Sequence, residues 1–303
     1  MFGRVSLIAL SLALLASSAS AVTILPDPST IIDGVPVAVP YDDFFSYAAK
    51  LLVALDPMTP LDLSGFNTSA GTGHLDILLY AGAGGAKNDP VADGQTFEDP
   101  VDAPGGSVHT FSGLWGAGLG PHGPVTVDQV AAYLHHQFGP AANVPVFTFD
   151  LVEPGSVAER DLKLVAKFSV VDPMGPGLGD DVEIAAWALD STPNHLFDPA
   201  SFLTVPGELT VVGTSQTYTV DTTGSGKADF VIFSPTMDLS PYLGHGYEFH
   251  AFLSLDDIDG GPEEAFISGG IAAPGTPIIP EPSSLALVSL GGLGFLRRRL
   301  RRV

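Results

Sequence analysis

The sequence predicts a mainly β protein: an antiparallel β-sandwich ectodomain with one or two short helices, flanked by an N-terminal signal helix and a C-terminal hydrophobic helix. Three observations lead to this class. From residue 146 onward, apolar and polar residues alternate in short runs that Gly, Pro and Asp separate. The hydrophobic fraction of 45%, with 18 Phe, is enough for a sizeable core. The chain lacks βαβ alternation and a fixed-period repeat, which argues against a parallel α/β sheet and a solenoid.

The N-terminal 21 residues have the three parts of a secretory signal. Arg4 supplies the positive charge, and residues 5–16 form an apolar run. Ala19-Ser20-Ala21 is a small-x-small site of the kind that signal peptidase accepts. We expect signal peptidase to cleave after Ala21, so that Val22 begins the mature chain; a retained anchor helix is the alternative.

Two helices are predicted in the ectodomain, residues 22–276. The first follows Asp42-Asp43 and ends at Pro57; its apolar residues at helical spacing are Phe44, Phe45, Ala48, Leu51, Leu52 and Leu55. The second begins at a capping-box pair, Thr126 and Gln129, and ends at Gly139-Pro140. Its apolar face is expected to hold Val127, Val130, Ala131, Leu134 and Phe138. A division into two subdomains, if present, would fall near residues 125–145.

Strands account for most of the remaining ectodomain. The strands are expected at residues 75–80, 146–151, 162–170, 182–189, 208–212, 217–220, 229–233 and 247–255. Residues 221–229 are expected to turn the chain between two of these strands as a hairpin. Trp187 has apolar residues on its side of a strand and should be buried, whereas Trp115 in a Gly-rich loop is the better candidate for exposure.

The charge distribution excludes one class of partner. The formal net charge is -22, from 34 Asp and Glu against 12 Lys and Arg. Within residues 22–282 the cations are Arg160 and five Lys. Because phosphate binding needs clustered Lys and Arg, we expect no nucleic-acid partner. The absence of Cys excludes disulfides, thiolate metal sites and a cysteine nucleophile.

The C-terminal segment, residues 277–303, contains the most specific pattern. Pro280-Glu281-Pro282 precedes Ser283-Ser284, an apolar stretch at 285–296, and five Arg within the last seven residues. Twelve helical residues at ~1.5 Å each reach only about 18 Å, short of a ~30 Å hydrocarbon core. With both Ser and snorkelling Arg side chains, residues 283–296 can still form a short transmembrane helix whose Arg-rich end stays cytoplasmic. An ordinary tail anchor is the alternative.

This ordered set resembles the PEP-CTERM sorting signal. The resemblance implies a substrate of an exosortase, a membrane protease that cleaves at or near Pro280, Glu281 and Pro282. It also implies export, transient membrane anchoring and a final place at the cell surface or outside the cell, typically in Gram-negative hosts that make exopolysaccharide. Residues 146–150, 221–235 and 255–267 are similar to ectodomains of bacterial PEP-CTERM proteins of unassigned function, which implies no activity.

Calcium is the one cofactor that the sequence leaves open. Residues 256–264 contain five carboxylates, which repel one another unless water or a cation screens them. Calcium suits such a stretch because it is a hard cation with flexible oxygen coordination. A second stretch, 221–232, has calcium-loop spacing but carries Ile232 where a bidentate Glu is needed, so a turn is favoured. A solvated loop is the alternative for both stretches. The candidate ligands are Asp256, Asp257, Asp259, Glu263, Glu264, Asp221 and Asp229.

Three functions follow from these observations. The first is an exported, exosortase-processed surface or matrix protein with no catalytic role, linked to exopolysaccharide. The alternative is a calcium-dependent carbohydrate-binding module. The second alternative is a secreted glycoside hydrolase, which needs two carboxyls at a defined separation. Nothing in the sequence selects a pair from Glu153, Glu183, Glu208 and Glu248.

Overall fold

The computed structural model describes residues 22–277, apart from 33, 50, 53–74, 81–87, 89–90, 92–93, 104–109, 120–121, 152–161, 175–180, 205–207, 211–216, 220–228 and 259–262. Residues Val22–Pro277 belong to one compact unit. The predicted signal helix and the predicted transmembrane helix at 283–296 lie outside the described residues. Within the described part of the chain, no helix has the length and apolar character needed to cross a membrane.

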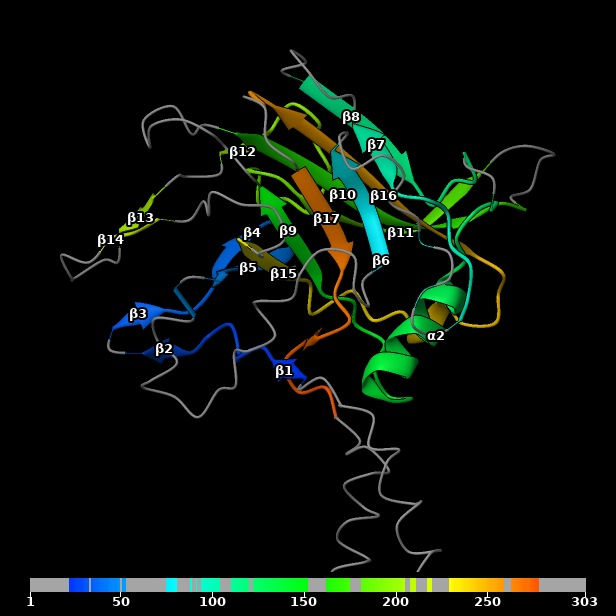
Figure 1. Ribbon diagram of the computed structural model, residues 1–303, viewed down its shortest axis with the longest axis horizontal. Coiled ribbons are helices and arrows are strands. Elements are labelled where there is room, and N and C mark those ends of the chain that lie inside the picture. The colour runs from blue at the N-terminus through cyan, green and yellow to red at the C-terminus, as the bar shows by residue number, and fades with distance from the viewer. Residues whose placement is uncertain are drawn as a thin grey trace, which may run out of the picture. The chain divides into compact units, whose positions relative to one another are not determined.

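The larger sheet has seven strands in the order β4-β5-β15-β9-β17-β6-β7 (Figure 1). All of its pairs are antiparallel except β6 with β7. Its strands are β4 (Val39–Tyr41), β5 (Phe44–Ala48), β15 (Phe230–Phe233), β9 (Phe147–Leu151), β17 (Glu263–Ile267), β6 (Leu75–Tyr80) and β7 (Val101–Ala103).

The second sheet has the order β11-β10-β16-β8, and β12 also pairs with β10. Every pair in it is antiparallel. Its strands are β11 (Val182–Leu189), β10 (Lys163–Asp172), β16 (Glu248–Asp256), β8 (Thr110–Trp115) and β12 (Leu203–Thr204). The mainly β, antiparallel class predicted from the sequence is confirmed.

Three two-stranded sheets complete the β structure of the described residues. β1 and β18 are parallel, whereas the other two pairs are antiparallel. The pairs are β1 (Thr23–Ile24) with β18 (Ile271–Ala272), β2 (Ile31–Ile32) with β3 (Val35–Pro36), and β13 (Glu208–Thr210) with β14 (Thr217–Thr219). The described residues also include a 3-10 helix, η4 (Ser240–Tyr242).

Aromatic side chains from the two large sheets meet in one core. Phe147 of β9 stacks on Phe168 of β10 with ring centroids 4.0 Å apart. Phe44 of β5 lies 5.4 Å from Phe168, and Phe249 of β16 lies 6.5 Å from Phe147. All four rings are at most 1% exposed. Because each buried Phe removes a large apolar area from water, these contacts hold the sheets against each other.

The helix α2 (Val127–Phe138) begins at the predicted capping box. The Gln129 amide donates to Thr126 Oγ1 at 3.2 Å, and the Thr126 amide donates to Gln129 Oε1 at 2.8 Å. The predicted apolar face is buried. Tyr133 is also buried, and its hydroxyl donates to the carbonyl of Ile267 at 3.2 Å. This bond joins α2 to the end of β17, so the helix belongs to the same core as the sheets.

The first predicted helix is wrong over residues 44–48, which form β5. Phe44, Phe45 and Ala48 fit a helical spacing, but aromatic residues such as the two Phe also favour strands. In the fold, this segment pairs with β4 on one side and β15 on the other. Two ladders of backbone hydrogen bonds override the local helical pattern.

The hairpin expected around residues 221–229 is also wrong. β14 pairs with β13, whereas β15 inserts between β5 and β9. Strand pairing is decided by contacts between distant segments, so adjacency in sequence was a poor guide here.

Trp187 is buried as predicted, but Trp115 is fully buried where exposure was expected. Its Nε1 donates to the Glu98 carbonyl at 3.1 Å. The Glu98 carboxylate accepts from the amides of Gly116, Gly118 and Leu119 at 2.9–3.1 Å. Glu98 therefore binds the indole through its main-chain carbonyl and binds the loop after β8 through its buried carboxylate.

Gly116 gives a test of this close packing. Its φ is +94°, and a Cβ there would lie well inside van der Waals contact of the Phe249 carbonyl oxygen. We expect Gly116→Ala to lower the free energy of unfolding by more than ~3 kcal/mol. Gly123→Ala is the matched control, because φ is +75° but a Cβ meets nothing within 4 Å; it should cost only ~1–2 kcal/mol. Equal losses in urea denaturation would contradict the packing described here.

Candidate functional site

The predicted calcium ligands are divided between the two large sheets. Asp256 ends β16, and Asp257 follows with φ +60° and pairs with the Lys163 ammonium group. Glu263 and Glu264 lie buried in β17, in the other sheet, and Asp229 is buried just before β15. Asp221 and Asp259 lie outside the described residues. None of the five described acids belongs to the group of three metal donors found among the described residues.

Glu264 instead gathers with two acids that the sequence analysis did not select. It is the cross-strand partner of Asp150 in β9, while Asp76 of β6 is opposite Phe266. Asp76, Asp150 and Glu264 are 6%, 1% and 4% exposed. Both Asp residues lie inside apolar runs, LDILLY and FTFDL, and a charged residue in such a run was the available signal.

Burial shifts the titration of these carboxyls. Burial, followed by the charges of Asp76 and Asp150, raises the pKa of Glu264 to about 8. Burial raises the pKa of Asp76 to about 6, although its hydrogen bond with Glu264 opposes this. Because adjacent buried carboxylates cannot both ionise cheaply, Glu264 is the protonated donor and Asp76 the acceptor. The raised pKa values thus mark Asp76 and Glu264 as interacting buried carboxyls on adjacent strands of the sheet.

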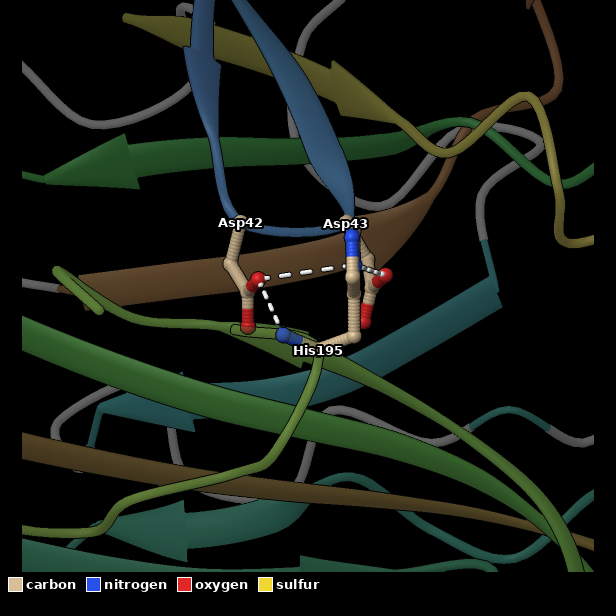
Figure 2. A group of neighbouring side chains, drawn as sticks. All are labelled: Asp42, Asp43 and His195. Atoms are coloured by element: carbon tan, nitrogen blue, oxygen red, sulfur yellow. Dashed lines mark hydrogen bonds and ion pairs between the residues drawn. The ribbon is translucent and has the colours of Figure 1, made fainter. Parts of the chain in front are cut away.

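A second cluster joins the two sheets at the β4–β5 turn (Figure 2). Asp42 and Asp43 form this turn, and His195 lies in the segment between β11 and β12. The His195 amide donates to Asp42 Oδ1 at 2.8 Å, and His195 Nδ1 lies 2.6 Å from Asp43 Oδ1. The Ala188 amide of β11 donates to Asp43 Oδ2 at 2.8 Å. We call Asp42, Asp43 and His195 the clasp.

Asp43 favours the protonated form of His195 within the clasp. The hydrogen bond and charge of Asp43 raise the pKa of His195, and burial raises the pKa of Asp42. The Asp42 and Asp43 side chains are 0% and 10% exposed, whereas that of His195 is 75% exposed. Within the described residues, these three donors can also share a metal ion. At 2.6 Å the His195–Asp43 contact is a hydrogen bond, so a cation would require His195 to lose its proton and withdraw.

The outer face of the five-stranded sheet carries a groove of about 530 Å³. Lys167 and Ser169 of β10 face Phe252 and His250 of β16 across the strand pair. The lining includes Lys167, Ser169, Glu183, Phe197, His250 and Phe252. Several of these polar groups are paired: Lys167 Nζ donates to Glu183 Oε2 at 2.8 Å, and His250 Nε2 lies 2.9 Å from Glu248 Oε2. The groove therefore combines apolar rings with oriented polar groups, as small-molecule sites do.

The wall of the groove comes from the segment between β11 and β12. The Phe197 ring meets Phe252 edge-on with centroids 5.7 Å apart, and Lys167 Nζ lies 5.7 Å from the Phe197 centroid. Asp190 accepts from the amides of Thr192 and Asp198 at 2.7 and 2.9 Å, which shapes this segment. His195 of the clasp is two residues from Phe197. The clasp thus attaches the groove wall to the other sheet.

The four acids considered for glycoside hydrolysis have different positions. Glu183 and Glu248 are both cross-strand partners of Val171, so they lie on either side of β10 on the groove face. Glu208 lies in β13, and Glu153 lies outside the described residues. Glu183 and Glu248 are brought together by the antiparallel register of three strands. Sequence spacing does not reveal this register, so it gave no reason to pair them.

The shared proton of the Asp76–Glu264 pair predicts a pH-dependent stability. A raised carboxyl pKa means that the folded chain binds more protons, so stability falls as pH rises from the ordinary Glu value of 4.5 to about 8. We expect Glu264→Gln to raise the free energy of unfolding by ~1–2 kcal/mol at pH 8 and to change it little at pH 5. Glu183→Gln, which replaces an exposed carboxyl, is the control. Its effect on the free energy of unfolding should be similar at both pH values. Parallel stability curves for wild type and Glu264→Gln would contradict a shared proton.

Comparison with known proteins assigns the C-terminal segment. Residues 279–302 match the family model of the PEP-CTERM protein-sorting motif. No curated protein and no solved structure matches the chain. The motif implies export, transient anchoring at the membrane, processing by an exosortase and release. The predicted sorting signal is confirmed: this chain carries the PEP-CTERM protein-sorting motif at its C-terminal end.

Proposed function

We propose that the chain is an exported, non-catalytic protein of the cell surface or extracellular matrix that associates with exopolysaccharide. Signal peptidase removes residues 1–21, and exosortase cleaves at or near Pro280-Glu281-Pro282. The match of residues 279–302 to the sorting motif is the observation that carries this proposal. The released part is a β-sandwich ectodomain, residues 22–276, with the acidic surface of a soluble extracellular domain.

The groove carboxylates favour a binding role over hydrolysis. A glycoside hydrolase needs one carboxyl that stays protonated and one that attacks or activates water. Glu183 already pairs with Lys167, and Glu248 already pairs with His250. Both carboxylates therefore serve as fixed partners of neighbouring polar groups.

Replacement of Glu281 tests the processing step. Because the Pro-Glu-Pro tripeptide is the recognition element, we expect Glu281→Ala to leave a longer product that stays in the membrane fraction. Ser284→Ala, three residues away, is the matched control and should be processed normally. Immunoblotting of membrane and culture fractions measures retention, and mass spectrometry of the native product should find Val22 first and the Arg cluster absent.

Two outcomes would count against this proposal. Unchanged processing of Glu281→Ala would remove the role of the tripeptide in sorting. Turnover of any substrate in a panel of chromogenic glycosides and esters, lost in Glu183→Gln or Glu248→Gln, would replace the non-catalytic role with a hydrolytic one.

A further inference from the structure

We propose that the groove on the outer face of the five-stranded sheet binds a short stretch of a neutral polysaccharide. The inference depends on the proposed function only for the source of the ligand, an exported polysaccharide. The groove volume of about 530 Å³ lies within the ~300–1,000 Å³ range of small-molecule sites. Three properties of the groove determine the ligand class: its apolar surfaces, its polar groups and its charge.

The apolar surfaces suit the C–H faces of sugar rings. Phe197 and Phe252 meet edge-to-face at an interplanar angle of 75°, so they form two walls of an angular apolar surface. Leu114 of β8 is the cross-strand partner of Phe252 and extends this surface along the sheet. A pyranose presents apolar ring faces and a polar rim, and it can lie against such rings while its hydroxyls point elsewhere.

The polar groups suit hydroxyls, which both donate and accept hydrogen bonds. The Ser169 hydroxyl and the His250 imidazole belong to cross-strand partners, and both residues are at most 9% exposed. The Lys167 ammonium group and the Glu183 carboxylate hold each other in position at one side. A lining that contains both donors and acceptors matches a hydroxylated ligand better than it matches a purely apolar one.

The charge disfavours anionic ligands. Asp181 and Glu183 line the groove, and Glu248 pairs with His250 at its floor, against the single ammonium group of Lys167. The whole chain carries 34 acids against 12 Lys and Arg. A uronic-acid or sulfated polymer would therefore meet like charge, whereas a neutral polymer would not.

The clasp acts on this groove as a positioning device. His195 is held by Asp42 and Asp43 of the seven-stranded sheet, and it precedes Phe197 by two residues. The wall that carries Phe197 is therefore fixed before any ligand arrives. Preorganisation of this kind improves affinity because less ordering remains to be done on binding.

Affinity electrophoresis of the released, processed protein tests the groove. Separate gels contain one of three neutral polymers, which are dextran, a soluble β-glucan and galactomannan. A further gel contains alginate as the anionic comparison. We expect retardation by at least one neutral polymer and none by alginate. Phe252→Ala and Phe197→Ala should each weaken binding about tenfold or more, because aromatic anchors carry most of the binding energy. Leu196→Ala, exposed at 70% on the same segment, is the matched control and should bind normally.

Three results would contradict polysaccharide binding in the groove. The neutral polymers could all leave the mobility of the protein unchanged, or alginate alone could retard it. A folded Phe197→Ala variant could also bind as well as the wild type. Ser169→Ala provides a smaller change if an aromatic variant fails to fold, and it should also weaken binding. The processing assays test the C-terminus independently of the groove. A correctly released protein that binds none of the polymers would therefore contradict the proposed binding site and leave the sorting assignment intact.

A double-mutant cycle tests the positioning role of the clasp. We expect His195→Ala to weaken polymer binding several-fold with little change in thermal stability, because its side chain is largely exposed. In a Phe197→Ala background the same change should have no further effect, since His195 acts through the wall. Additive losses in the cycle would mean that His195 does not work through Phe197.

Discussion

The stacked rings of Phe147 and Phe168 join the two large sheets, and the rest of the structure depends on that contact. Their centroids are 4.0 Å apart, and Phe44 and Phe249 pack around them. The chain has no cysteine, so no covalent link supplements this core. With one face of the five-stranded sheet committed to the aromatic core, side-chain alternation directs Lys167, Ser169, His250 and Phe252 to the opposite face. The groove is thus a direct consequence of core packing.

Much of the fold could be predicted because its signals are local. Period-two alternation located β10, β11 and β16 within a few residues, and the Thr126–Gln129 pair located the start of α2. The failures have a common cause in long-range pairing. Phe44–Ala48 became a strand through contacts with β4 and β15, and β15 joined β5 and β9 instead of β14.

The site residues divide in the same way. The Pro280-Glu281-Pro282 motif could be recognised because its meaning lies in a short linear pattern. The clasp could not be predicted, because Asp43 and His195 are 152 residues apart and meet only across the sheets. Glu264 was selected as an acid, but its partners Asp76 and Asp150 depend on the register of β6 and β9 with β17. Sequence reasoning therefore identified the sorting signal more readily than the clasp or the groove.

The location of the clasp has a mechanical consequence. His195 belongs to a segment beside the five-stranded sheet, while Asp42 and Asp43 lie in the turn between two strands of the seven-stranded sheet. Sliding one sheet along the other would stretch these few hydrogen bonds long before it exposed the aromatic rings between the sheets. Partly exposed polar bonds give way at lower cost than a dry interior. A shearing load on the domain would thus free the Phe197 wall first, while the aromatic interior stayed intact.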